Sequence, residues 1–132
     1  MIKTHHDLIS SWLEKSRRDL SAAEYAMTSE EVFPDIICFH AQQSAEKSLK
    51  ALIVTHGETV PKTHNLGNLV SIIEEWEPGI ISILEDALDL TPYAIESRYP
   101  DSDNPSYEDA KEAIQSATRI REIVLEKIHS SD

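Results

Sequence analysis

Apolar residues recur along most of this chain at the spacing of an amphipathic helix. Between residues 7 and 27, alternating steps of four and three form one stripe, made of Ile9, Leu13, Ser16, Leu20, Ala23 and Met27. Such a stripe is typical of a helix that packs one face against a core. The pattern predicts five helices, at about 7–27, 34–56, 65–76, 80–95 and 106–128. No alternating strand pattern competes with it.

Local signals mark several of the predicted helix ends. Pro34 suits the first turn of the second helix, because an N–H at that position has no helical partner anyway. Gly57 tolerates positive φ and is typical of the residue that follows a helix. The step into Pro92 predicts a kink or an end in the fourth helix. Ser106, followed three residues later by Asp109, resembles an N-terminal cap of the last helix.

Short connections between long amphipathic helices place neighbouring helices antiparallel. The sequence therefore predicts an all-α fold, an up-and-down four-helix bundle with an additional short helix. Only three glycines and six prolines are present, which also favours helices over a meander of strands. Because the chain has no internal repeat, low-complexity tract or linker, we expect a single helical domain over residues 1–132.

Composition is that of an ordinary globular chain, with 40% hydrophobic and 27% charged residues. The one cysteine, Cys38, excludes an intramolecular disulfide and argues against a thiolate metal cluster. His5 and His6 are adjacent and would point to different sides of a helix, so they do not form a metal pair. No apolar leader or membrane-spanning stretch is evident. We therefore expect a cytoplasmic protein with no membrane association, metal or cofactor.

Acidic residues dominate the charge. The formal net charge is −12, and from Thr63 to Ala110 there are eleven acidic residues and one base, Arg98. Non-specific binding to nucleic acid depends on Lys and Arg contacts to phosphates, so this charge opposes it. A basic surface on a protein partner is a better match. Arg98 itself suits either a ligand contact or a structural ion pair.

The predicted second helix has an unusual polar side. His40, Gln43 and Lys47 fall within one narrow sector at 100° per residue. The opposite sector is small or apolar, and is made of Ile37, Ala41, Ala45, Ser48, Leu49 and Leu52. Small residues allow close approach, so the second helix is expected to be central. Its polar side then lines a cleft or meets an identical subunit; the alternative is an ordinary solvated face, ion-paired through Glu46 and Lys50.

Several cationic and aromatic residues together suit an anionic ligand such as a small nucleotide. The candidate nucleotide-binding residues are His40, Gln43, Lys47, Lys62, His64, Arg98 and Tyr99. Lysine and arginine bind phosphates, a tyrosine ring stacks on a base, and a glutamine amide bonds to the edge of a base. Structural roles remain open for three of them. His64 would instead cap the third helix, Arg98 would pair with Glu96 or Asp101, and Tyr99 would anchor a loop.

The stretches FHAQQSAEKSLKALIV, PKTHNL and SRYP, in this order, resemble the HEPN domain family, named for its occurrence in higher eukaryotes and prokaryotes and a proposed nucleotide-binding role. The likeness covers nearly the whole chain. It implies an all-helical bundle that commonly dimerises. It also implies a small prokaryotic member of the kind often encoded beside a minimal nucleotidyltransferase, with which such proteins form a two-component or toxin–antitoxin system.

Many members of that family are metal-independent ribonucleases with an arginine followed, after four to six residues, by a histidine. This chain departs from that pattern, because the positions at this spacing from Arg98 hold Asp103, Asn104 and Pro105. No catalytic residue is therefore assigned, and a nucleotide-binding dimer that partners a nucleotidyltransferase is the favoured function. An atypical ribonuclease is the alternative, with Arg98 and a histidine from elsewhere, His40 or His64, as acid–base group.

Overall fold

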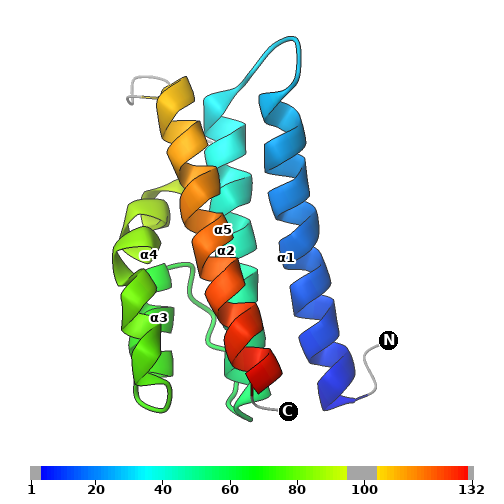
Figure 1. Cartoon of the computed structure of the whole chain (residues 1–132), viewed down its shortest axis with the longest axis vertical. Helices are drawn as coiled ribbons and strands as arrows, with labels where there is room; N and C mark the ends of the chain where they lie inside the picture. The colour runs from blue at the N-terminus through cyan, green and yellow to red at the C-terminus, as the bar shows by residue number, and fades with distance from the viewer. Residues whose placement is uncertain (1–3, 95–103, 131–132) are drawn as a thin grey trace.

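The computed structural model describes residues 4–94 and 104–130. The expected all-α fold is confirmed, and no strand occurs among the described residues. Three long helices dominate: α1 (His5–Met27), α2 (Pro34–Thr55) and α5 (Tyr107–Ser130). Between α2 and α5, the described residues form four short elements: α3 (Leu66–Glu74), the 3-10 helix η1 (Pro78–Ile83), α4 (Leu84–Leu90) and the 3-10 helix η2 (Thr91–Ala94). In Figure 1 the three long helices stand side by side, with α3 and α4 on the side away from α1.

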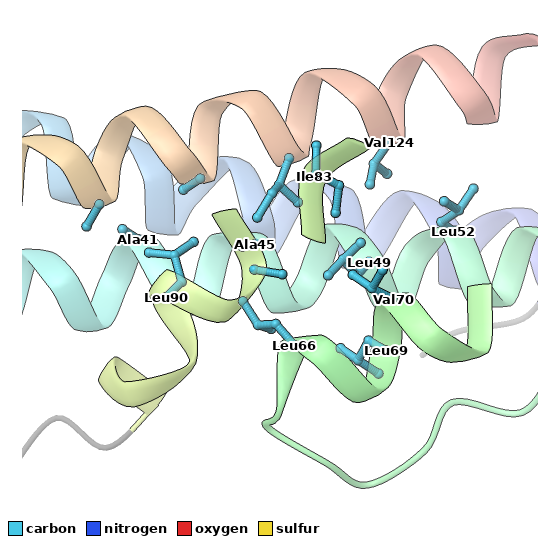
Figure 2. Packing of buried hydrophobic residues seen from close by; sticks show 14 of the residues in the cluster. Ala41, Ala45, Leu49, Leu52, Leu66, Leu69, Val70, Ile83, Leu90 and Val124 are labelled. Carbon is cyan, nitrogen blue, oxygen red and sulfur yellow. The ribbon is translucent and has the colours of Figure 1, made fainter. Parts of the chain in front are cut away.

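Helix α2 is the central element, as the small residues of its sequence predicted. It contacts α1, α5, α3, α4 and η2, so most of its circumference is covered. Side chains from its partners meet the α2 residues Ala41, Ala45 and Leu49 in an apolar core (Figure 2). The core side chains labelled there from α3, η1, α4 and α5 are Leu66, Leu69, Val70, Ile83, Leu90 and Val124.

The contact between α1 and α2 includes small and hydroxylated residues. The Ser16 hydroxyl donates to the backbone carbonyl of Ser44 at 2.8 Å, and the two serine hydroxyls lie 3.2 Å apart. Both serines are fully buried, as is Ala23 two turns further along the α1 stripe. Side chains of this size allow two helix backbones to approach closely, and the hydrogen bond satisfies the buried hydroxyl of Ser16. Polar side chains near this contact are therefore held between two rigid helices.

The expected fourth helix at 80–95 differs from a single long helix. Its first part is 3-10 helix, the α-helical part spans only Leu84–Leu90, and η2 follows. The step at Pro92 ends α4 as predicted, because proline has no N–H for the next helical bond. Thr91 contributes by donating its hydroxyl to the Ala87 carbonyl at 2.9 Å. Ile95, the expected last residue of that helix, lies outside the described residues.

Caps at the helix starts agree with the sequence signals. Ser106 and Asp109 form a reciprocal capping box: the Asp109 N–H donates to the Ser106 hydroxyl at 3.0 Å, and the Ser106 N–H donates to the Asp109 carboxylate at 2.9 Å. In addition, Thr4 caps α1 through the Asp7 N–H. Among the described residues, no helix has the length and apolar character that crossing a membrane requires.

Gly57 terminates α2 with φ of +86°. Its N–H donates to the Val54 carbonyl at 2.9 Å, and the Glu58 N–H donates to the Ile53 carbonyl at 3.2 Å. This is the Schellman arrangement, which requires a left-handed residue after the helix. The turn redirects the chain back along α2 toward His64.

Replacing Gly57 by alanine tests this turn. A Cβ at this position would meet nothing within 4 Å, so strain at positive φ is the main effect. We expect Gly57→Ala to lower the free energy of unfolding by about 1 kcal/mol. Gly57→Asn is the matched control and should cost less, because asparagine tolerates the left-handed region. Urea unfolding measures both variants, and equal stability of wild type and Gly57→Ala would contradict the assignment.

The buried Cys38 thiol gives a second test of the core. Burial, with a smaller contribution from the nearby Asp109 charge, raises the pKa of Cys38 to about 12. The folded state therefore favours the protonated thiol. The contribution of Cys38 to the free energy of unfolding is fully present below pH of about 8.5, the pKa of an unfolded cysteine, and is lost as pH rises toward the raised pKa of the folded state. We expect a disulfide reagent at pH 8 to modify the folded protein slowly and the urea-unfolded protein rapidly. Rapid stoichiometric modification without urea would show that Cys38 is accessible.

Candidate functional site

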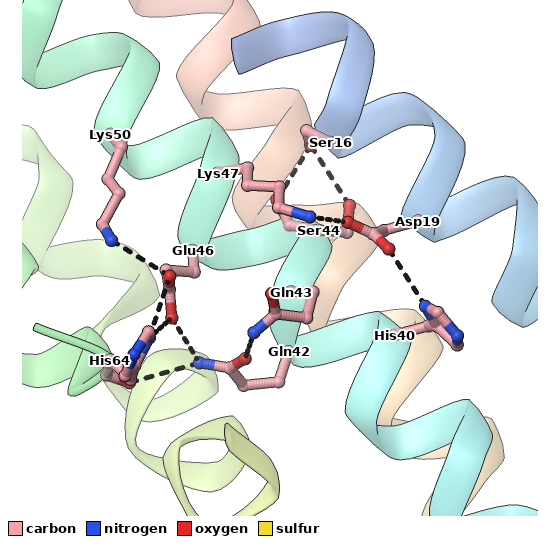
Figure 3. A network of polar contacts seen from close by, with 10 residues as sticks. All are labelled: Ser16, Asp19, His40, Gln42, Gln43, Ser44, Glu46, Lys47, Lys50 and His64. Carbon is pink, nitrogen blue, oxygen red and sulfur yellow. Dashed lines mark hydrogen bonds and ion pairs between the residues drawn. The ribbon is translucent and has the colours of Figure 1, made fainter. Parts of the chain in front are cut away.

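Two carboxylates organise the polar side chains of α2 (Figure 3). The first is Asp19 of α1, whose side chain is 14% exposed. One oxygen lies 3.0 Å from the His40 Nδ1, and the other accepts a hydrogen bond from the Lys47 ammonium at 2.5 Å. His40 and Lys47 are two turns apart on α2, so they share a side of that helix. Their side chains remain 32% and 23% exposed.

The second carboxylate is Glu46, which is almost fully buried. It accepts a hydrogen bond from the Lys50 ammonium at 3.0 Å and another from the Gln42 amide at 3.1 Å, and it lies 3.0 Å from the His64 Nδ1. Only 5% of the Glu46 side chain and 8% of the Lys50 side chain are exposed. Glu46 and Lys50 therefore pair as the alternative of a solvated face expected, but the pair is buried and does not form such a face.

The loop after α2 explains this burial. The Gln42 amide also donates to the backbone carbonyl of His64 at 3.2 Å, which fixes the end of that loop against α2. On the other side, the Lys50 ammonium lies 5.8 Å from the centre of the Trp12 ring of α1. A lysine ammonium over an aromatic ring at this distance is a favourable cation–π arrangement. Lys50 is thus held by a buried carboxylate and an indole ring.

Gln43 lies between the two carboxylate groups, and its side-chain amide donates a hydrogen bond to the side-chain oxygen Oε1 of Gln42 at 2.7 Å. The structure thus brings four predicted site residues, His40, Gln43, Lys47 and His64, into neighbouring polar contacts on α2 (Figure 3). Lys62 is exposed on the loop, two residues before His64. Arg98 and Tyr99 lie outside the described residues.

His64 does not cap α3. The cap is Asn65, whose side chain accepts the Asn68 N–H at 3.2 Å, while His64 binds Glu46. The His64 side chain is nevertheless 72% exposed, so its ring has an accessible side as well as a bonded one. This combination suits a residue that anchors the loop and still contacts a ligand.

Asp19 and Gln42 are essential to this arrangement, and sequence reasoning missed both. Asp19 contacts α2 residues only because α1 and α2 form an antiparallel hairpin around the turn at 28–33. Positions equally far from that turn lie opposite each other, which also pairs Ser16 with Ser44. This register could have identified Asp19 from the sequence, because it places this acidic residue, which lies beside the α1 stripe, opposite His40 in the hairpin.

The cluster retains hydrogen-bond donors for a ligand. An ammonium group has three N–H donors, and Lys47 uses one on Asp19 within the described part of the chain. His40 uses one ring nitrogen on the same carboxylate, which leaves Nε2. The pair therefore provides donors at a partly exposed position, while Asp19 keeps both side chains in place. Within the described ranges, no group of three or more His, Cys, Asp or Glu side chains is placed to hold a metal.

A separate aromatic contact lies at the C-terminal end of α2. The His56 ring stacks on the Trp76 indole, with ring centres 3.8 Å apart and planes within 6°. These rings line a small cavity of about 240 Å³ together with Leu52, Thr55 and Glu77. The stack joins the end of α2 to the residues that follow α3.

The family model described as the HEPN domain matches residues 9–128. The crystal structure of TT1696 from Thermus thermophilus is similar at 30% identity and a TM-score of 0.78, covering 90% of this chain and 97% of that one. The structure of ST0689, an archaeal HEPN homologue, is similar at 30% identity and a TM-score of 0.72, covering 91% and 97%. No curated protein matches.

Removing the Glu46 charge tests the buried network. Glu46→Gln leaves the Lys50 ammonium buried without its counter-ion, and we expect the free energy of unfolding to fall by about 3 kcal/mol. The double variant Glu46→Gln/Lys50→Met removes both charges and should recover part of that loss. Glu24→Gln, at an exposed position of α1, is the control and should change stability by less than about 0.5 kcal/mol. Urea unfolding measures all three variants, and a double variant less stable than Glu46→Gln would contradict this explanation.

Proposed function

Because this chain belongs to the HEPN domain family, we propose that it is a nucleotide-binding helical dimer that acts as the partner of a minimal nucleotidyltransferase. Such a pair would constitute a two-component system of the toxin–antitoxin kind. The observation that carries the nucleotide-binding part is the pair His40 and Lys47, held on one carboxylate at a partly exposed position. The partner and the dimer are inferred from family resemblance and from the charge of the surface.

The proposed nucleotide site extends from this pair to Gln43, Lys62 and His64. Lys47 and Lys62 supply contacts to a phosphate, and Gln43 bonds to the edge of a base. Arg98 and Tyr99, outside the described residues, complete the proposed set. The aspartate and glutamate that hold the cluster limit its net positive charge, which favours a small nucleotide over a long polyanion.

A protein partner is supported by the distribution of acidic residues. Residues 66–94 carry no lysine or arginine, and their acidic residues are Glu74, Glu75, Glu77, Glu85, Asp86 and Asp89. Of these, Glu74, Glu75, Glu85 and Asp89 are exposed. A surface of one charge accelerates association with a surface of the opposite charge. We therefore propose that α3 and α4 face a basic surface of the nucleotidyltransferase.

A non-catalytic role is supported by the sequence around Arg98. The family's ribonucleases place a histidine at positions that here hold Asp103, Asn104 and Pro105. The side chains of Asn104 and Pro105 cannot act as the general acid or base in RNA cleavage. Among the described residues, His40 and His64 each bond to a carboxylate through Nδ1. We assign these bonds to positioning the rings for ligand contact.

Calorimetric titration with ATP, AMP and GTP tests the nucleotide site. A charge-assisted hydrogen bond contributes about 1.5–3 kcal/mol, so Lys47→Ala should weaken binding by about tenfold or more. Lys111→Ala removes a lysine from an exposed position of α5 and should bind like wild type. No heat from wild type with any nucleotide, or equal affinity of wild type and Lys47→Ala, would contradict the site. Co-elution with a co-expressed nucleotidyltransferase tests the partnership separately.

A further inference from the structure

An arginine between α1 and α5 lacks a counter-ion. The Nε of Arg121 is buried and has no hydrogen-bond partner, and the guanidinium forms no ion pair within the described part of the chain. Arg121 as a whole is only partly buried, but a buried N–H such as its Nε almost always finds a partner. The chain has 24 acidic residues against 12 lysines and arginines. The missing partner therefore does not reflect a shortage of carboxylates.

The nearest charges make the position of Arg121 still less favourable. Helices α1 and α5 are neighbours (Figure 1), and Arg17 of α1 acts on Arg121 as a like charge. Burial lowers the pKa of Arg121 and the Arg17 charge lowers it further, whereas the Glu14 carboxylate raises it. One arginine on each of these two helices is therefore close enough to repel the other.

Glu14 cannot neutralise all the cations there. Its two oxygens accept hydrogen bonds from the Nε and Nη2 of Arg17, both at 2.8 Å, and one also accepts from the Arg18 Nε at 3.3 Å. Both oxygens are thus already bonded by arginines of α1 itself. We call Glu14, Arg17, Arg18 and Arg121 the arginine cluster. Its three guanidinium groups and one carboxylate give it a formal charge of +2, in a chain whose formal net charge is −12.

We propose that the arginine cluster binds a phosphate group between α1 and α5. A phosphate near neutral pH carries a charge of about −2, which matches the charge of the cluster. Guanidinium groups bind phosphate oxygens through two parallel N–H donors, and the Arg121 guanidinium donates no hydrogen bond within the described residues. The phosphate is inorganic or belongs to a phosphomonoester, since both present the same dianion to the arginines.

This site is separate from the proposed nucleotide site. Arg17 and Asp19 are two residues apart on α1, so their side chains leave the helix about 200° apart. Asp19 is bonded to His40 and Lys47 of α2, whereas Arg17 interacts with Arg121 of α5. The two sites therefore lie on different sides of α1, and loss of one should leave the other intact.

Calorimetric titration with inorganic phosphate and with AMP, at constant ionic strength set by chloride, tests the proposal. We expect saturable phosphate binding by wild type and affinity weaker by about tenfold or more in Arg121→Met, which keeps the packing of the side-chain stem. Arg121→Lys keeps the charge without the guanidinium and should weaken binding to a smaller extent. Lys111→Met, an exposed lysine on the same helix, is the control and should bind phosphate like wild type.

Each result decides the proposal. Phosphate binding together with a component of AMP binding that is lost in Arg121→Met but kept in Lys47→Ala assigns a phosphomonoester; phosphate binding without such a component of AMP binding assigns the free ion. No saturable binding of phosphate or AMP by wild type, or unchanged phosphate affinity in Arg121→Met with a native circular dichroism spectrum, would overturn it. Lys47→Ala, which tests the nucleotide site, should keep its phosphate affinity. Failure of one site is therefore distinguishable from failure of the other.

Discussion

The burial of the Glu46 carboxylate is the constraint on which the arrangement around α2 depends. A charge with so little solvent contact needs partners, and it finds them in Lys50, Gln42 and His64. His64 lies at the end of the loop after α2, so this contact fixes where the chain enters α3. Asn65 then caps α3, and Leu66 begins the packing of α3 on the core. The contact of the buried Glu46 carboxylate with His64 thus joins the central helix to the part of the molecule that follows it.

Much of the fold could be predicted because periodicity is a local property. The stripe of α1, the proline at the start of α2 and the glycine at its end each specify structure within a few residues. The contacts of Glu46 could not be predicted in the same way. Helical spacing shows that Glu46 and Lys50 can pair, but their burial depends on the path of the loop up to His64 and on Trp12 of another helix. Asp19 was missed for the same reason, since the register between two helices decides its partners.

Charge is distributed unevenly over the surface. Acidic residues are exposed on α3 and α4, whereas Arg17, Arg18 and Arg121 gather between α1 and α5. Helix α1 separates two cation-bearing regions, one shared with α2 and one shared with α5. In the first, carboxylates hold the cations in place. In the second, the cations exceed the carboxylates. Because of this difference, a small ligand at the first region would share its donors with Asp19, whereas an anion at the second would complete the charge balance.

The two tryptophans of the chain lie at different joints of the bundle. Trp12 faces the Lys50 ammonium where α1 meets α2, and Trp76 stacks on His56 where the chain leaves α3. Each indole therefore has a polar or aromatic neighbour that is lost when its own joint opens. Fluorescence of single-tryptophan variants would consequently follow the separation of α1 from α2 and the release of α3 from α2 as two distinct optical signals. The two tryptophans are therefore intrinsic fluorescence probes of the order in which the helices separate during unfolding.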